Sequence, residues 1–471
     1  MATPTNSPTR QLSEFARSLT WGDVDAAALA AARVAVLDSV GCMFGGSRTS
    51  LVADAARLME TLGGAPQATV VAQPMRASMP FAAFLNSLQA NALDYDDAFE
   101  RDGKGMGHPG STVVPAALAV AEKVGATGGE FLLAVIAGYE VANRIIEAIQ
   151  PTPARHAKVW GVAVHQAFGS AAAAARLLKL DEAAFQNALG LAGAASTVPA
   201  ARKWNWRDRP LLTPKDIVAA PAEAGVRAAL FAGIGWQGSR DILDGDSGFW
   251  IMAGSDRCDF SRLTDRLGER WTVRELSFKP YPACRWTHTA IEVTEGLMAE
   301  HGLSASDIAA CEVGSFEDTV TNFDDRRPRT MIDAEFSLPW TVAVAMAGLP
   351  KGEAWYAPAT LSDPAIHALV DKVRLHVDAE AQRLHYSDER KTMAVVSLTT
   401  TDGRRFERRL AVARGGVASP WPEGGIEAKF RAQVSPVLGE AGAARLQDTL
   451  LSLGEESEFS ALPPLLAGDP E

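Results

Sequence analysis

The segment QAFGSAAAAARLL, residues 166–178, decides the fold because it carries five consecutive alanines within a helical hydrophobic pattern. Small side chains of this kind let neighbouring helices pack closely together. The same helical period recurs in several other segments, which are residues 23–46, 111–124, 129–149, 181–194 and 219–232. A helical bundle therefore accounts for most of the first 270 residues.

The pattern changes beyond about residue 270, where short β-branched segments appear. Residues 393–413, MAVVSLTTTDGRRFERRLAVA, are rich in β-branched side chains on both sides of Asp402-Gly403, which predicts a hairpin. Further strands are expected at residues 310–316 and 374–377, and helices at residues 287–300 and 336–347. This part of the chain is predicted to form a smaller α+β domain.

The C-terminal tail turns helical again at residues 426–434 and 440–451, and we expect it to pack back onto the first helical segment. A chain of 471 residues is also too long for one ordinary core. The predicted fold class is therefore mainly α, with a large all-helical domain built from both chain ends. That domain comprises residues 1–270 and 416–471, and the α+β domain comprises residues 271–415.

Composition and charge limit the possible functions. Hydrophobic residues make up 47% of the chain and charged residues 22%, which is typical of a globular protein. The formal net charge of -12 argues against nucleic acid as the main partner, because phosphate binding needs clustered lysines and arginines. A few cations gathered in one pocket could still bind a small anion.

The cysteines and the apolar segments indicate the cellular compartment. The four cysteines lie far apart and form no C-x-x-C pair, so we expect reduced thiols. The first twenty residues lack the apolar region of a signal peptide. Charges interrupt apolar runs such as residues 131–141 before the roughly 20 residues that a membrane span needs. The expectation is a soluble, cytoplasmic protein with no membrane partner.

The segment NALDYDDAFERDGKGMGHPG, residues 91–110, crowds Asp94, Asp96 and Asp97 together before a glycine-rich loop and His108. Like charges at this spacing repel unless one carboxyl is protonated or a cation lies among them. A solvated acidic loop is one interpretation, and a metal site formed with His108 is another. His108 precedes a predicted helix, whose first N–H groups favour a bound anion, although such a histidine can equally cap or pack.

A second candidate segment, SFKPYPACRWTHTAIE at residues 277–292, contains Lys279, Arg285 and His288. Pro280 and Pro282 exclude a regular helix or a central strand, so a fixed extended loop presents the Lys279 ammonium. A surface loop is the simpler interpretation. Three cationic or titratable groups on one rigid segment nevertheless favour an anion site.

Two further regions hold candidate residues. Residues 201–216 alternate basic and aromatic side chains, and Lys215 is the candidate for a second substrate cation. Such alternation can bind single-stranded nucleic acid, but the acidic remainder of the chain favours a loop over a pocket or at a subunit interface. His165 begins the alanine-rich helix, either as a buried core histidine or as a substrate contact.

Some chemistries have no motif in this sequence. It contains no G-x-S-x-G elbow, no Walker loop, no H-E-x-x-H and no G-x-G-x-x-G after a strand. These absences argue against a hydrolase of the elbow type, a P-loop enzyme, a zinc protease and a dinucleotide-binding protein.

Several blocks taken together resemble the MmgE/PrpD family, whose known members include 2-methylcitrate dehydratase, cis-aconitate decarboxylase and iminodisuccinate epimerase. They follow the family order over nearly the whole chain and are LDSVGCMFGG at 37–46, NALDYDD and HPGSTVVPAALAVAE within 91–122, GYEVANRI at 138–145, FGSAAAAARLL at 168–178, FKPYPACRWTHTAIE at 278–292 and DAEFSLPWTVAVAM at 333–346. The resemblance implies a homodimer in which each subunit has a large helical domain and a smaller α+β lid. It also implies an active site between these domains, with no cofactor and no metal.

Site residues follow from the resemblance, position by position. Asp94 matches the first Asp of the family's D-x-D-D, His108 the His of its HP motif, and Lys279 the Lys of its K-x-(F/Y)-P motif. These three are expected to be catalytic. The residues expected to bind substrate are Lys215, Arg285, His288, His165 and Asp97.

The chain also departs from the family pattern. Ala98 stands where D-x-D-D is commonly followed by Thr, and Trp160 stands where many relatives have a His. A Tyr used by some decarboxylase relatives falls at Asn322 or Phe323. These departures bear on which reaction of the family the protein performs.

The prediction is a cofactor-independent lyase of the hydro-lyase type that acts on a small hydroxy di- or tricarboxylate through an α-carbanion. Lys279, Arg285 and Lys215 would stabilise the charge next to a substrate carboxylate. His108, held by Asp94, would move the proton. One alternative is an isomerase that moves an α-proton of a dicarboxylate such as iminodisuccinate. Another is a binding protein that has lost catalysis.

Overall fold

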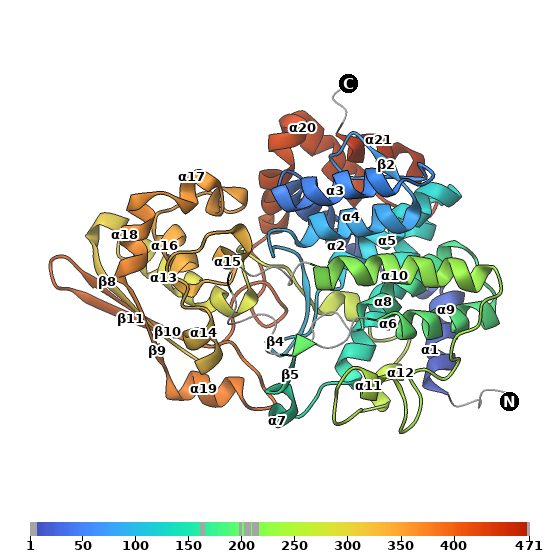
Figure 1. Cartoon of the computed structure of the whole chain (residues 1–471), viewed down its shortest axis with the longest axis horizontal. Coiled ribbons are helices and arrows are strands. Elements are labelled where there is room, and N and C mark those ends of the chain that lie inside the picture. Colours follow the sequence, from blue (N-terminus) through green and yellow to red (C-terminus); the bar gives the residue numbers. More distant parts are fainter. Residues whose placement is uncertain (1–6, 161–164, 197–199, 202–208, 210–215, 469–471) are drawn as a thin grey trace.

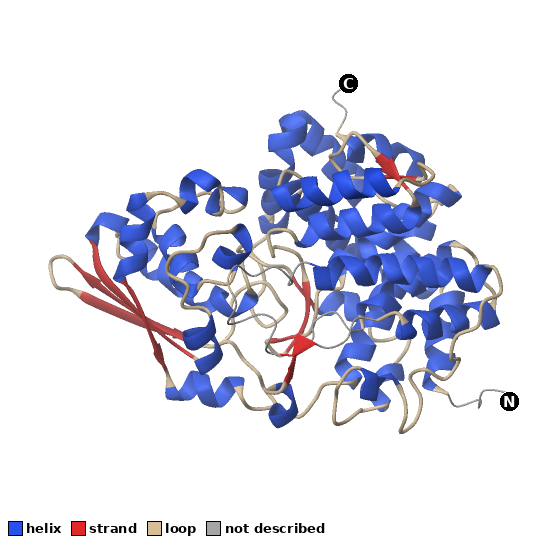
Figure 2. Cartoon of the chain, viewed as in Figure 1, coloured by secondary structure: helices blue, strands red, loops and turns tan. Residues whose placement is uncertain are grey.

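The computed structural model describes residues 7–160, 165–196, 200–201, 209 and 216–468. Figures 1 and 2 show two parts side by side: a larger helical part at the right and a smaller part with a sheet at the left. The protein is mainly α with a smaller α+β part, as the sequence predicted. The domain boundaries at residues 270 and 415 stay a prediction.

The larger part consists of helices whose apolar faces meet in one core. In chain order they are α1 (Pro8–Ser18), α2 (Ala26–Gly46), α3 (Ser50–Leu62), α4 (Met79–Asn91), α5 (Gly110–Val124), α6 (Gly128–Ala148), α7 (Pro153–His156), α8 (Gln166–Leu177), α9 (Glu182–Ala194), α10 (Asp216–Gly233), α11 (Phe249–Met252) and α12 (Ser261–Thr264). The sequence patterns located the ends of α5, α6, α8 and α9 to within one residue. Helix α2 begins later than expected because the Asp25 side chain accepts the N–H of Ala28 at 2.7 Å and so caps the helix.

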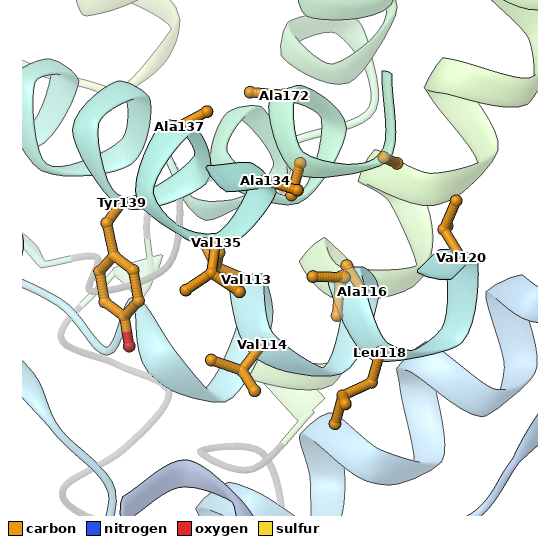
Figure 3. Close-up of a cluster of buried hydrophobic side chains, with 14 of the residues drawn as sticks. Val113, Val114, Ala116, Leu118, Val120, Ala134, Val135, Ala137, Tyr139 and Ala172 are labelled. Atoms are coloured by element: carbon orange, nitrogen blue, oxygen red, sulfur yellow. The ribbon is translucent and has the colours of Figure 1, made fainter. Parts of the chain in front are cut away.

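Helices α5, α6 and α8 pack closely because small residues line their contacts. A Cβ added to Gly138 of α6 would lie 2.5 Å from Val113 Cγ1, and one added to Gly169 of α8 would lie 2.8 Å from Ala142 Cβ. Figure 3 shows the short side chains of valine and alanine that fill the space around these contacts. This is the close packing that the alanine run in residues 166–178 predicts.

The smaller part is built around a four-stranded sheet of order β11-β10-β8-β9. Its strands are β8 (Ile308–Ser315), β9 (Val373–Val377), β10 (Ala394–Thr400) and β11 (Arg405–Leu410). Strands β10 and β11 form the predicted antiparallel hairpin, and β8 pairs antiparallel with β10 and parallel with β9. The helices of this part are α13 (His288–Glu300), α14 (Glu317–Asn322), α15 (Met331–Glu335), α16 (Leu338–Met346), α17 (Pro358–Leu361), α18 (Pro364–Lys372) and α19 (Ala379–His385).

The C-terminal helices α20 (Gly425–Leu451) and α21 (Leu462–Ala467) return to the larger part. Phe430 and Val434 of α20 belong to the same apolar core as Val36 of α2. Gly439, with φ 69° and ψ 169°, interrupts α20 and separates the two helical segments that the sequence predicted.

Helix α2 is long and apolar enough to cross a membrane by length and composition alone, as the one such helix in the described residues. However, 72% of its apolar window is buried inside the protein. A mostly buried core helix passes the same test, so this is weak evidence for a membrane span.

A small antiparallel sheet joins the acidic segment to the lysine-bearing loop. Strand β3 (Ala98–Arg101) pairs with β4 (Lys104–Gly105) and with β7 (Leu276–Ser277). Ala98 lies opposite Ser277, so the residues just before β3 and just after β7 come close together. The two stretches that the sequence singled out therefore meet. Two more short strand pairs are β1 (Ala68–Thr69) with β2 (Arg76–Ala77) and β5 (Val159–Trp160) with β6 (Ala200–Ala201).

Candidate active site

The three aspartates that follow α4 are buried and make different contacts. Asp94, Asp96 and Asp97 are 5%, 0% and 2% exposed, so this segment is not a solvated acidic loop. Asp94 has a φ of 47°, a left-handed conformation that aspartate adopts more readily than most residues. The Asn91 amide donates to Asp96 Oδ1 at 2.9 Å. Buried carboxylates of this kind need a positive partner.

Lys279 supplies that positive charge from the loop after β7. Its Nζ lies 2.7 Å from Asp94 Oδ1, 2.9 Å from the Asp94 backbone oxygen and 3.7 Å from Asp96 Oδ1. Burial acts to lower the pKa of Lys279, but attraction to Asp94 and Asp96 outweighs burial and raises it. An ammonium has three donors, and two of them bind Asp94, so one remains for a substrate.

His108 is held by Asp96, which corrects the expectation that Asp94 holds it. The Nδ1 atom of His108 lies 3.1 Å from Asp96 Oδ2. The reason is that the Asp94 carboxylate binds Lys279, which leaves Asp96 to face the imidazole. Burial opposes ionisation of Asp96, but the charges of His108 and Lys279 outweigh burial and lower its pKa. When Nδ1 donates to Asp96, Nε2 is the nitrogen that can accept a proton.

Asp97 positions the loop that carries His108. Its Oδ1 accepts the N–H of Gly110 at 2.8 Å, and its Oδ2 accepts the hydroxyl of Tyr139 at 2.8 Å. A Cβ on Gly110 would lie 2.6 Å from Asp97 Oδ1, so glycine is needed there. Burial raises the pKa of Asp97 to about 7. Both carboxylate oxygens of Asp97 thus bind the protein itself, and the substrate contact expected at Asp97 stays a prediction.

The start of α8 lies against the same loop. The Gln166 side-chain amide donates to the backbone oxygen of His108. His165 is fully buried, and neither of its ring nitrogens has a hydrogen-bond partner among the residues that the structure describes. Burial, together with the charge of His108, lowers the pKa of His165 to about 3, so the ring is neutral at neutral pH. A substrate contact at His165 stays a prediction.

Arg285 and His288 are more fully paired than the sequence suggested. The Arg285 guanidinium lies 3.0 Å from Glu100 Oε2 and donates to the backbone oxygens of Ala413 and Arg414. His288 is fully buried, with Nε2 2.9 Å from the Ala283 oxygen and Nδ1 3.3 Å from Arg285. Both ring nitrogens of His288 are thus occupied, so this geometry favours a structural role in place of the expected substrate contact.

A cavity of about 170 Å³ lies beside the lysine–aspartate–histidine cluster. Asp94 and His108 line it from the larger part, and Lys279, Cys284 and Arg285 line it from the loop after β7. A histidine and a cation therefore line one partly open cavity. Asp97, His165 and His288 are not among the described residues that line it.

The sequence also led us to expect a substrate contact at Lys215. Lys215 lies outside the described residues, so its role stays a prediction.

Asp94, Asp96 and His108 each offer a ligand atom within 4.8 Å of the others, a spacing that could hold a metal ion. The Lys279 ammonium already provides a positive charge at these carboxylates. The Lys279 ammonium, the two carboxylates and the His108 imidazole thus form one connected cluster of charged and titratable groups.

Sequence reasoning left Asp96 out of the candidate residues although it lies within the same D-x-D-D. The sequence pattern gave no basis for choosing which of the three neighbouring carboxylates contacts His108. It also left out Glu100, the partner of Arg285, because nothing in the sequence pairs β3 with the loop after β7. The one available signal for Asp96 was the HP motif 12 residues later, which needs a carboxylate partner.

Two family models match this chain over most of its length. The model of the MmgE/PrpD N-terminal domain matches residues 10–259, and that of the MmgE/PrpD C-terminal domain matches residues 281–455. Cis-aconitate decarboxylase of Homo sapiens is 25% identical over 449 residues, which cover 92% of this chain and 89% of that protein. The Mus musculus protein of the same name is 25% identical over 454 residues, covering 92% and 88%.

A relative with lower sequence identity also aligns over most of the chain. Cis-aconitate decarboxylase of Aspergillus terreus is 21% identical over 481 residues, which cover 97% of this chain and 95% of that protein. The N-terminal family model spans the segment with Asp94 and His108. Because two models of one family match in order over most of the sequence, the chain belongs to the MmgE/PrpD family.

Proposed function

We propose that this protein is a lyase that removes water from a small hydroxy di- or tricarboxylate. The observation that carries the proposal is the cavity shared by Lys279 and His108, with Asp94 and Asp96 connecting them. Negative charge must build at a carbon next to a carboxylate in such a reaction. A cation and a base that face one cavity meet this requirement.

The remaining N–H of Lys279 donates to the substrate carboxylate and stabilises the charge that develops beside it. A well-placed donor of this kind contributes on the order of 10²- to 10³-fold in rate. Nε2 of His108 takes the proton from the carbon, for roughly 10²- to 10⁴-fold. Asp96 fixes the ring and stabilises the imidazolium that forms. The imidazolium of His108 then gives its proton to the hydroxyl group on the neighbouring carbon. The carbon–oxygen bond breaks, water leaves, and the electron pair of the carbanion forms the double bond.

No step in this mechanism transfers an electron, so we propose that no cofactor is needed. We also propose a homodimer, as the family resemblance implies, and a cytoplasmic location, which the scattered cysteines favour. Sedimentation velocity of the purified protein tests the dimer, and a single species at the monomer mass of 49.9 kDa would contradict it.

Decarboxylation is the second candidate, because three relatives that align over most of the chain are named cis-aconitate decarboxylases. In that reaction carbon dioxide leaves, and the resulting carbanion takes a proton. The same cluster serves it, with His108 starting as the imidazolium and Lys279 holding a carboxylate that stays. The two candidates differ in the bond that breaks.

Incubation with citrate, cis-aconitate and iminodisuccinate in D₂O separates the candidates by proton NMR. Water loss with a new conjugated double bond supports the dehydratase, and carbon dioxide release from cis-aconitate supports the decarboxylase. Deuterium incorporation without net change indicates an isomerase. A rise in melting temperature without turnover indicates a binding protein.

The matched variant for this experiment is His108→Gln. We expect it to lose at least about 10²-fold in kcat because the ring that moves the proton is absent. Circular dichroism and sedimentation check that it stays folded and assembled. Near-normal turnover by His108→Gln would remove this residue from the mechanism.

A further inference from the structure

Arg390 lines the same cavity as Lys279 and His108, but it comes from a different segment of the chain. It follows α19 and precedes β10, and its backbone has a φ of 43°, the left-handed region. A non-glycine residue in that conformation is uncommon and carries strain. Its guanidinium donates through one terminal nitrogen, Nη2, to the side-chain oxygen of Gln150. Gln150 also lines the cavity.

The guanidinium of Arg390 has no acidic partner in the described part of the chain, where no carboxylate oxygen lies within 4.0 Å of it. The charge of Asp388 acts on the Arg390 guanidinium. However, the Asp388 side chain is 70% exposed, and its Oδ1 lies 2.7 Å from Nη2 of Arg257. Lys104 adds a further cation, with its Nζ 3.4 Å from the Asp388 backbone oxygen. Burial and the charge of Arg390 lower the pKa of Lys104 to about 8. Lys104 and Asp388 do not line the cavity, so Arg390 is a cation of the cavity lining with no ion pair in the described part of the chain.

At Lys279, which lines the same cavity, the carboxylates outnumber the cations. There the single charge of Lys279 faces the carboxylates of Asp94 and Asp96. Arg285, the other arginine that lines the cavity, is neutralised by Glu100. An anion with several negative charges thus finds an uncompensated cation at Arg390, which comes from a different segment of the chain than Lys279 and His108.

We propose that Arg390 binds a second carboxylate of the substrate and makes the enzyme select acids with at least two carboxylates. The inference deepens the proposed function and rests on it for the reaction at Lys279 and His108. A guanidinium presents five N–H donors in a planar fork that matches a carboxylate. Gln150 takes one N–H of Nη2 and fixes the plane. The other N–H of Nη2 stays available to form a bidentate contact together with the N–H of Nε or of Nη1 that lies beside it.

The kinetic test compares Arg390→Gln and Arg390→Lys with the wild type on whichever acid of the panel turns over. We expect Arg390→Gln to raise KM at least tenfold with little change in kcat, because a contact remote from the reacting carbon is lost equally from ground and transition states. Arg390→Lys keeps the charge without the fork and should fall between. An unchanged KM in Arg390→Gln overturns the proposal.

A matched control comes from α19, the helix that precedes Arg390. Arg383 on α19 has a side chain that is 64% exposed, and its nearest acidic partner, Glu389, lies at 3.9 Å. Arg383→Gln removes the same charge close by along the chain without touching the cavity, so we expect its KM to equal that of the wild type. A KM raised as much as in Arg390→Gln would show that general charge, rather than the Arg390 contact, is responsible.

A binding test needs no turnover. Melting temperatures are measured with maleate, which has two carboxylates, and with the cis isomer of crotonate, which has the same cis double bond and one carboxylate. We expect maleate to stabilise the wild type more than the cis isomer of crotonate does, and Arg390→Gln to lose the difference. A difference that persists in Arg390→Gln, or a wild type that maleate does not stabilise, overturns the inference. Arg390-dependent selection of maleate without turnover of any acid would instead count against the lyase alone.

Discussion

Two buried lysine–aspartate pairs of this protein look alike and differ in their surroundings. Lys279 Nζ lies 2.7 Å from Asp94, and Lys429 Nζ lies 2.6 Å from Asp38. Each lysine also donates to a backbone oxygen, that of Asp94 at 2.9 Å or that of Tyr95 at 2.7 Å. Both lysine side chains are only 1% exposed.

The difference lies in what surrounds each pair. Lys279 and Asp94 line the cavity together with His108, and the Asp94 side chain is 8% exposed. Asp38 is 1% exposed, and Lys429 lies over the ring of Tyr95, 4.2 Å from its centroid. The second pair joins α20 to α2 inside the helical core. The cavity and the neighbouring His108 are therefore what distinguish the Lys279–Asp94 pair from the Lys429–Asp38 pair.

The largest expected effect is on turnover. Lys279→Met should lower kcat/KM by about 10³-fold, because it removes a donor aimed at the developing charge. Lys429→Met removes the same group from the other pair and should keep the activity per folded molecule within roughly threefold, which is a difference below about 0.7 kcal/mol. Steady-state kinetics at a temperature where both variants are folded measures this. Equal losses in the two variants would break the comparison.

The second effect is on stability and should run in the opposite order. Lys429→Met leaves Asp38 buried without a partner, so we expect it to lower the free energy of unfolding by about 3–5 kcal/mol. Lys279→Met should lower it by less, because the Asp94 carboxylate borders a cavity that water can enter. Urea denaturation of each variant measures the loss. Adding Asp38→Leu to Lys429→Met should recover part of it, since no charge is then left unpaired.

The smallest effect is on the pH dependence of the unfolding free energy and involves Asp97. Burial raises the pKa of Asp97 from 3.8 to about 7. A carboxyl with a raised pKa in the folded state stabilises the protein fully below the unfolded pKa, and this contribution is lost as pH rises through the folded pKa. The unfolding free energy of the wild type, relative to Asp97→Asn, should therefore fall by about 1–2 kcal/mol between pH 5 and pH 7. A difference that does not change with pH would show that Asp97 is already ionised.

Much of the fold could be predicted because it depends on local patterns. The alanine run located α8 to within one residue, and Asp402-Gly403 located the hairpin turn between β10 and β11. The kink at Gly439 could also be anticipated, as two helical segments in the tail. In each case the signal lies within a few residues of the structure that it specifies.

The site could be predicted only in outline. The sequence brought attention to Lys279 and His108, and the cavity contains both. It could not assign Asp96 to His108, because that choice depends on where the backbone turn at Asp94 directs each carboxylate. The pairing of Lys429 with Asp38 joins residues 391 positions apart, and no local pattern reports a contact of that range.

The most direct test of the central claim is a crystal structure of His108→Gln with the preferred acid bound. The account predicts the acid in the cavity, with one carboxylate oxygen about 3 Å from Lys279 Nζ and the reacting carbon facing position 108. An acid bound elsewhere, with Lys279 still in contact only with Asp94, would contradict it.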